Sequence, residues 1–324
     1  MTQISPTGLS RNPVWQLNKT TLWYYPTHSR KFTTPLLLIY SPVNKPDILD
    51  LIRGKSVIGS FVNAGFEVYL LEFGEPGYED KDDSLEDYVA KYVQKAASRT
   101  LLHSKAENLT VIGYCLGGTL AAIYASIAEE KIKNLILYAA PIDFEETNVY
   151  SKWLYELRSA NETDINQMTE WSRLISASEV KAGMRLLTSP VYFSPYLALL
   201  GRTDDPAYIQ KWIRFNKWAN SYLPMPGAFV RDIVLELAKK NSLIKGKLSI
   251  MNRKVKLKNI SCNLLVICGE DDQLVSENQS RPIIEHVSSK DKTFLISKKG
   301  HTGVTISEGQ LPEFLDKWLP PRSR

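Results

Sequence analysis

The sequence predicts an α/β fold built on a mostly parallel sheet. Short, mainly apolar runs separated by helical segments recur along the chain, at residues 36–40, 67–71, 109–113, 134–139, 263–268 and 293–296. They do not alternate with polar residues, which is typical of strands in a parallel sheet that is covered on both faces. Between these runs, apolar residues at three- and four-residue spacing predict helices over 85–95, 120–130 and 308–318.

The alternation of strand and helix patterns stops between residues 143 and 259. Four of the seven tryptophans fall in this stretch, at Trp153, Trp171, Trp212 and Trp218. An insertion after the strand at 134–139 would lie over the carboxyl ends of the sheet, where α/β proteins bind ligands. We therefore expect a core formed by residues 1–142 and 260–324, with a helical cap insertion at 143–259. A separate helical domain beside the sheet is the alternative.

The composition excludes several classes of protein. With 44% hydrophobic and 23% charged residues over 324 positions, the chain is typical of a soluble globular protein. A net charge of +5 is too small to predict nucleic-acid binding. Residues 109–128 carry no charge, but their glycines favour a buried strand that turns into a buried helix over a transmembrane segment.

Cysteine usage and the N-terminus both favour the cytoplasm. Cys262 and Cys268 flank one predicted strand, so they would lie roughly 20 Å apart and cannot form a disulfide. Cys115 is the third cysteine. Residues 1–18 contain no apolar segment of the kind that a secretory signal requires. We therefore expect a chain without disulfides in a reducing compartment.

The segment from Gly113 to Gly118, G-Y-C-L-G-G, has the form of a nucleophile elbow with cysteine in place of serine. Small residues on both sides allow the tight turn that raises the nucleophile above the sheet. Cys115 would begin a helix, whose dipole favours the thiolate. The backbone amide of Leu116 is the expected first oxyanion donor, and Val43 is the expected second, because Pro42 has no N–H.

An acid and a base should follow the nucleophile in this order, each in a loop after a later strand. The strand at 263–268 leads into a loop with Asp271 and Asp272, of which Asp272 better fits the spacing after Gly269. The strand at 293–296 leads to His301. The other histidines, His28, His103 and His286, lie outside such loops. We therefore predict a Cys115–His301–Asp272 triad on an α/β-hydrolase fold, without a metal.

The elbow resembles the lipase-like box of polyhydroxyalkanoate synthases, in which cysteine replaces serine. Other segments resemble the same family in the same order, at 43–51, 72–76, 85–88, 139–144, 216–218, 241–246 and 300–304. The chain lacks the long N-terminal domain of the single-subunit synthases and is most similar to the catalytic subunit of the two-subunit classes III and IV. Three departures are Glu72-Phe73 for Asp-Trp, Gln273 for histidine and Ser276 for proline.

The resemblance implies an acyltransferase that polymerises (R)-3-hydroxyacyl-CoA of short chain length, such as 3-hydroxybutyryl-CoA, into polyhydroxyalkanoate with release of CoA. Cys115 would carry the acyl group as a thioester, His301 would be the general base, and Asp272 would assist attack by the hydroxyl. The implied partners are the growing polyester chain, a smaller second subunit and, in a homodimer, a second copy of the chain, at the surface of cytoplasmic polyester granules. No cofactor is implied, since the CoA thioester is the substrate.

Two other functions fit the same residues. One is a cysteine-dependent acyl-CoA thioesterase or hydrolase of the same fold, which would pass the acyl group to water. The other is a non-catalytic scaffold on granules, which would keep the fold without acylation of Cys115. The size of the product and the acylation of the cysteine distinguish these possibilities.

Overall fold

The computed structural model describes residues 2–5, 7–145, 159–188, 194–303 and 309–324. Among these residues, nine strands form one sheet in the order β1-β2-β3-β5-β4-β6-β7-β12-β13. Their bounds are β1 Gln3–Ile4, β2 Ser10–Leu17, β3 Thr20–Tyr25, β4 Leu36–Ile39, β5 Val68–Glu72, β6 Leu109–Tyr114, β7 Ile132–Tyr138, β12 Asn263–Gly269 and β13 Lys292–Ser297. The α/β fold class is confirmed.

The six strands from β5 to β13 in this order are parallel, and all six were predicted as buried runs. Strands β1 to β3 join them antiparallel at one edge. The sequence patterns missed these three strands. β2 is only half-buried and contains Pro13 at a register shift, so it forms no continuous apolar run.

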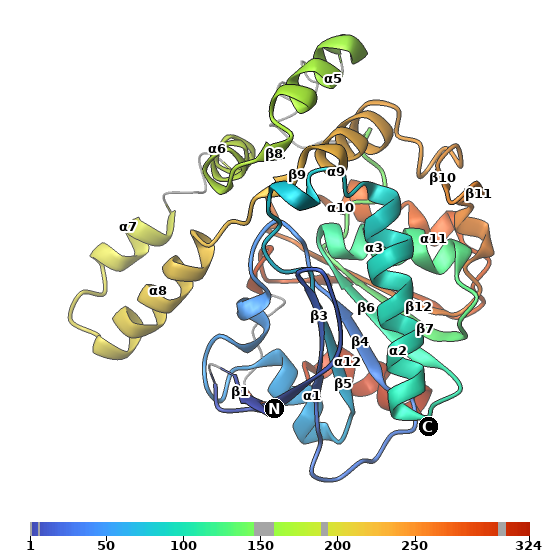
Figure 1. The fold of residues 1–324 in the computed structure, drawn as a ribbon. Coiled ribbons are helices and arrows are strands. Elements are labelled where there is room, and N and C mark those ends of the chain that lie inside the picture. Colours follow the sequence, from blue (N-terminus) through green and yellow to red (C-terminus); the bar gives the residue numbers. More distant parts are fainter. Residues whose placement is uncertain (1, 6, 146–158, 189–193, 304–308) are drawn as a thin grey trace.

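Helices cover both faces of the sheet (Figure 1). Along β7, Leu135 and Leu137 pack in one core cluster while Ile136 packs in the other, as the two-residue period of a strand requires. One cluster includes residues of the π-helix Asp87–Val93, α2 Gln94–Ser104, α3 Leu116–Ile127 and α11 Ile283–His286. The other includes residues of α1 Val57–Ala64 and α12 Glu313–Trp318.

All three predicted helices differ from the observed ones at their ends. The helix predicted over 85–95 continues through α2 to Ser104. α3 already begins at Leu116, immediately after the elbow. α12 begins only at Glu313, because Pro312 holds an extended conformation at its N-cap (φ −52°, ψ 140°). Residue 308, the expected start of that helix, lies outside the described residues. No helix in the described ranges is long and apolar enough to cross a membrane, and residues 109–128 form β6 and α3.

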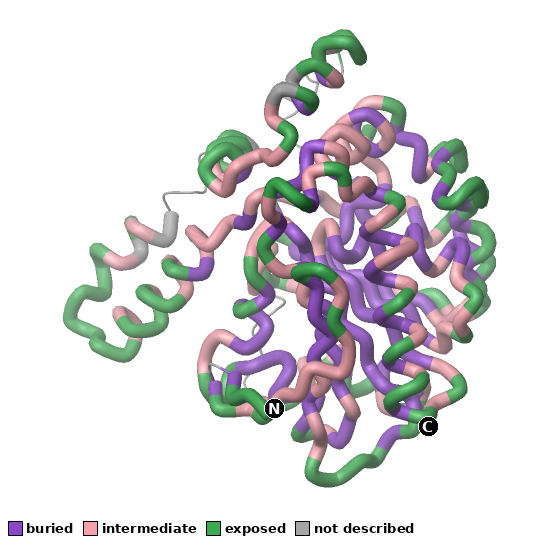
Figure 2. The backbone as a smooth tube through the Cα atoms, in the orientation of Figure 1, coloured by how far each residue is buried: buried purple, intermediate pink, exposed green. Residues whose placement is uncertain are grey.

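Between β7 and β12 the described chain is mainly helical. The elements are α5 Glu162–Trp171, β8 Leu174–Ile175, α6 Ala177–Thr188, α7 Ser194–Leu200, α8 Pro206–Ala219, β9 Met225–Pro226, α9 Gly227–Asp232 and the π-helix Ile233–Lys239. Figure 1 shows α5 to α8 extending outward from the core, and Figure 2 shows that much of this arm is exposed.

The later part of this insertion packs against the sheet. Phe229, Leu237 and Leu243 are fully buried in the cluster that also holds α3. A hairpin of β10 Ser249–Ile250 and β11 Arg253–Lys254 and a short 3-10 helix, Leu257–Asn259, lead into β12. The division of the chain at residues 143 and 259 stays a prediction.

Candidate active site

Cys115 lies between the last residue of β6 and the first residue of α3. Its backbone has φ 53° and ψ −130°, a conformation that non-glycine residues rarely adopt. Its amide donates a hydrogen bond of 2.9 Å to the carbonyl of Tyr138 on the neighbouring strand β7. Strain of this kind is maintained only where the surrounding structure fixes it, and it is concentrated at functional sites.

Two glycines allow the elbow to pack this closely. A Cβ atom on Gly113 would lie 2.5 Å from the Cα of Gly118, across the turn. A Cβ atom on Gly117 would lie 2.4 Å from the carbonyl oxygen of Ile39 at the end of β4. The elbow therefore needs glycine at both positions, because the atoms in the way are backbone atoms that cannot move aside.

Asp272 and His301 meet at the carboxyl ends of β12 and β13. The Nδ1 atom of His301 is 2.7 Å from Oδ2 of Asp272. The other carboxylate oxygen of Asp272 accepts hydrogen bonds of 2.9 Å from the amides of Leu274 and Val275. The Asp272 side chain is 0% exposed, whereas Asp271 is exposed. The buried carboxylate is thus fully satisfied, and it orients the imidazole.

His301, whose side chain is 17% exposed, also interacts electrostatically with Cys115. Burial alone would lower the pKa of His301, but the sulfur of Cys115 and the carboxylate of Asp272 outweigh burial and raise the pKa above its ordinary value of 6.5. The raised pKa makes the imidazole of His301 a stronger base for the proton of the Cys115 thiol. A thiolate is the nucleophilic form of cysteine.

Two of the other histidines are hydrogen-bonded elsewhere, His28 is exposed, and the other two cysteines are buried or partly buried. His103 pairs with the hydroxyl of Tyr69 at 2.7 Å, and His286 with the carbonyl of Pro282 at 2.8 Å. Burial raises the pKa values of both Cys262 and Cys268 to about 11, so these thiols stay protonated at neutral pH. Within the described ranges, no group of three or more His, Cys, Asp or Glu side chains is placed to hold a metal ion.

The two expected oxyanion donors have different surroundings. Leu116 is the first residue of α3, where an amide has no carbonyl one turn earlier to bond. The amide of Val43 faces the hydroxyl of Ser41 at 3.4 Å, a long and therefore weak hydrogen bond. The carbonyl of Val43 accepts a bond of 3.0 Å from the amide of Leu223. The roles of Leu116 and Val43 stay predictions.

The sequence patterns missed a pair of tyrosines beside the triad. The ring of Tyr114 stacks on that of Tyr40 with centroids 5.2 Å apart and an interplanar angle of 7°. Tyr114 also contacts His301, 187 residues further along the chain. No signal in the sequence links positions so far apart, although Tyr114 itself lies within the elbow motif.

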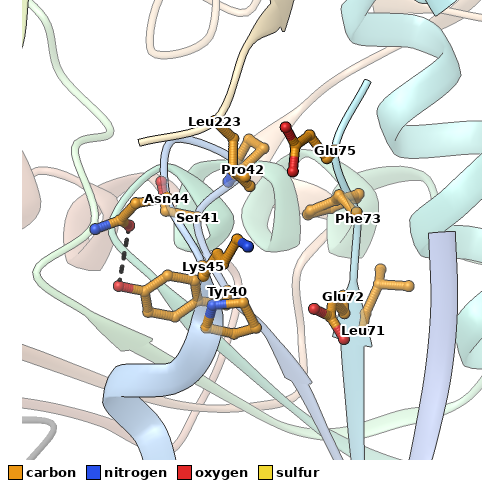
Figure 3. A pocket seen from close by; sticks show the side chains of 12 residues that line it. Tyr40, Ser41, Pro42, Asn44, Lys45, Leu71, Glu72, Phe73, Glu75 and Leu223 are labelled. Carbon is orange, nitrogen blue, oxygen red and sulfur yellow. Dashed lines mark hydrogen bonds between the residues drawn. The ribbon is translucent and has the colours of Figure 1, made fainter. Parts of the chain in front are cut away.

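A pocket of about 110 Å³ lies between the loop after β4 and the segment after β5 (Figure 3). Its lining includes Tyr40, Ser41 and Lys45 from the first segment and Phe73 and Glu75 from the second. Figure 3 shows the hydroxyl of Tyr40 directed at the Asn44 side chain, which accepts its hydrogen bond at 3.3 Å. Through Tyr40, the pocket wall is therefore in contact with the residue that precedes the nucleophile.

Comparisons with known proteins agree with this geometry. The family model described as alpha/beta hydrolase fold matches residues 46–304. Among solved structures, MenH from S. aureus superposes with a TM-score of 0.59 at 17% identity, over 94% of this chain and 99% of that protein. An alpha/beta hydrolase fold protein from Chitinophaga pinensis has a TM-score of 0.52 at 14% identity, over 98% of each chain.

Sequence relatives extend over nearly the whole chain. Proteins named poly(3-hydroxyalkanoate) polymerase subunit PhaC are 28% identical in Synechocystis, over 96% of this chain and 84% of the relative, and 26% identical in Thiocystis violacea, over 98% and 90%. The protein of the same name in Haloferax mediterranei is 27% identical over 99% of this chain. The chain spans 66% of that relative.

Proposed function

This chain belongs to the alpha/beta hydrolase fold family, and from that premise we propose that it is the catalytic subunit of a polyhydroxyalkanoate synthase. The predicted α/β-hydrolase fold is confirmed, and so is the predicted resemblance to polyhydroxyalkanoate synthases, which are acyltransferases. The single observation that carries the proposal is a cysteine at the elbow that interacts electrostatically with a histidine, which a buried carboxylate orients.

The first half-reaction loads the enzyme. His301 takes the proton of the Cys115 thiol, and the sulfur attacks the thioester carbonyl of (R)-3-hydroxyacyl-CoA. The amides of Leu116 and Val43 stabilise the negative charge on the carbonyl oxygen. The bond between the carbonyl carbon and the CoA sulfur then breaks, and CoA leaves as a thiol with the proton from His301. The acyl group remains on Cys115 as a thioester.

The second half-reaction forms the ester. His301 removes the proton from a 3-hydroxyl group, whose oxygen attacks the thioester on Cys115. The carbon–sulfur bond breaks and the sulfur recovers the proton from His301. Because one thioester replaces another in the first step, the energy of the substrate bond is retained for ester formation. This is the chemical advantage of cysteine over serine at the elbow.

Asp272 acts on the hydroxyl only through His301 in this scheme. Its carboxylate is fully covered and already accepts hydrogen bonds from His301, Leu274 and Val275. The assistance to the hydroxyl attack that the family resemblance implies for this acid would thus be orientation and charge stabilisation of the imidazole.

We further propose a second subunit and a location at polyester granules. The relatives are each named as a subunit of a polymerase, which supports a partner chain. The substrate of choice for the assay is (R)-3-hydroxybutyryl-CoA, the short-chain unit implied by the resemblance.

Release of CoA from (R)-3-hydroxybutyryl-CoA tests the function, measured with and without a co-expressed partner and followed by sizing of the product. We expect CoA release with high-mass polyester, lost in Cys115→Ala and retained in Cys262→Ala, a matched control on a thiol outside the site. Free 3-hydroxybutyrate as the product would identify a thioesterase. If no CoA is released even with the partner present, the chain would instead be the non-catalytic scaffold on granules.

A further inference from the structure

We propose that Tyr114 is a positioning residue that holds His301 in place for Cys115. Its hydroxyl donates a hydrogen bond of 3.0 Å to the backbone carbonyl of His301. Its ring lies against the imidazole, with centroids 5.2 Å apart and planes inclined by 52°. The proposal rests on the proposed function only in taking Cys115 and His301 as the working pair.

His301 needs such an anchor because of where it lies. It follows β13 in a turn that a hydrogen bond of 2.9 Å closes, from the amide of Gly303 to the carbonyl of Gly300. Asp272 fixes the imidazole at Nδ1. That bond fixes the imidazole ring and does not itself hold the backbone of the turn. Tyr114 fixes the backbone of the same residue, so the two bonds together determine both the position and the orientation of the imidazole.

Tyr114 is itself held firmly. It is 5% exposed, it is the last residue of β6, and its backbone is paired with β7. Its second neighbour is Tyr40 at the end of β4, whose ring is nearly parallel to its own. Tyr114 directly precedes Cys115 in the chain and is hydrogen-bonded to His301. Tyr114 therefore sets the spacing between the nucleophile and its base.

The titratable groups that face His301 are Cys115, Asp272 and Tyr114, with Tyr40 behind Tyr114. Tyr114→Phe removes one oxygen atom and keeps the ring between Tyr40 and His301. The carbonyl of His301 then loses its donor, and the imidazole is less well placed to stabilise the thiolate. The reactivity of Cys115 reports this change, and no acyl-CoA is needed to measure it.

The test is the pH profile of Cys115 alkylation by iodoacetamide, with the site of modification verified by peptide mass spectrometry. For Tyr114→Phe we expect alkylation at pH 7 to slow about fivefold, the worth of one hydrogen bond, and the midpoint of the profile to move to higher pH. The matched control is Tyr124→Phe. Tyr124 is 1% exposed and also loses one buried bond, of 2.8 Å to Glu130, but it lies away from the triad. Tyr124→Phe should lower the melting temperature about as much as Tyr114→Phe does, and it should leave the pH profile of Cys115 alkylation unchanged.

A wild-type profile in Tyr114→Phe would overturn the proposal, and so would an equal shift in Tyr124→Phe. A second variant, Tyr114→Leu, lacks both the hydroxyl and the ring and must show at least the loss seen in Tyr114→Phe. A Leu variant that alkylates like the wild type overturns the proposal even if the Phe variant is poorly folded. Because the probe is iodoacetamide, a chain without synthase activity could still confirm the positioning role.

Discussion

The indole Nε1 of Trp218, in the last turn of α8, donates a hydrogen bond of 2.8 Å to the backbone carbonyl of Lys45. Close by, Tyr222 forms an isolated antiparallel bridge with Asn44, and the amide of Leu223 donates to the carbonyl of Val43 at 3.0 Å. The end of the projecting arm is thus tied to the loop that carries one of the two proposed oxyanion donors.

Trp218→Phe should therefore lower both stability and activity. Trp218 is 7% exposed, and the Phe variant leaves the carbonyl of Lys45 without its donor, which should cost about 1 kcal/mol of folding free energy. We expect CoA release per folded molecule to fall about threefold to tenfold, because the Val43 amide is less well fixed. Thermal melting and the CoA-release rate measure the two effects.

The control for this experiment is Trp318→Phe. Trp318 is similarly buried, at 6% exposure, and its Nε1 donates at 3.1 Å to the hydroxyl of Thr293 on the edge strand β13, four strands from β4 in the sheet. Its loss should lower the melting temperature and leave CoA release per folded molecule unchanged. Equal loss of activity in the two variants would rule out a specific role for the bond between Trp218 and Lys45.

Asp272→Asn should reduce the rate of CoA release roughly 10²- to 10⁴-fold, as loss of the orienting carboxylate does in other triads. The amide can still accept from Leu274 and Val275, but it cannot stabilise the imidazolium that His301 forms. The adjacent Asp271→Asn is the control, since Asp271 is exposed and should tolerate the change. Equal rates in Asp272→Asn and wild type would contradict the assigned acid.

The sequence patterns that predicted the parallel strands depend on burial of both faces, which the parallel part of the sheet provides from β5 to β12, whereas the edge strand β13 is only partly buried. β1 and β2 lack that burial, and β3 is buried but begins with two threonines, so these three strands were missed. The placement of Cys115, Asp272 and His301 could be predicted because each follows a strand, and their catalytic roles stay predictions. The contact of Tyr114 with His301 and that of Trp218 with Lys45 could not, since each depends on tertiary packing between distant segments.

One departure from the family pattern has a local structural reason. Ser276, where proline is usual in the resembling family, is the N-cap of α10 Glu277–Ser280 and forms a capping box with Gln279. The amide of Ser276 donates to Oε1 of Gln279 at 3.0 Å, a bond that proline could not form. The sequence shows only that serine stands where proline is usual. The structure shows that this serine caps α10.

Gly117→Ala should destabilise the protein by about 2 kcal/mol or more, because the new Cβ atom would lie 2.4 Å from the carbonyl oxygen of Ile39. Gly183→Ala is the opposite case. Gly183 lies within α6 and has no atom within 4 Å of the added Cβ, so alanine should stabilise that helix by about 0.5–1 kcal/mol. Thermal melting measures the loss of stability in Gly117→Ala. Amide hydrogen exchange of α6 measures the gain in Gly183→Ala. Faster exchange in Gly183→Ala would contradict the expected gain.

Asp50 makes the stability of the fold depend on pH. It is 3% exposed, and its Oδ2 atom has no hydrogen-bond partner in the described structure. Burial raises the pKa of Asp50 above the ordinary value of 3.8, against the opposing effect of the hydroxyls of Ser5, Ser56 and Thr7 and the charge of Arg11. The contribution of this carboxyl to stability is therefore fully present below about pH 3.8 and is lost as pH rises through the higher pKa of the folded state.

Asp50→Asn removes this titration and nearly keeps the shape of the side chain. We expect the melting temperature of the variant, relative to wild type, to rise between pH 4 and pH 7, because only the wild type must then bury a charge. Asp47→Asn is the control, since Asp47 lies in the same short 3-10 helix, Pro46–Asp50, but is exposed. The difference in melting temperature between Asp47→Asn and the wild type should not change with pH. A constant difference for Asp50→Asn across this range would mean that burial does not perturb the carboxyl.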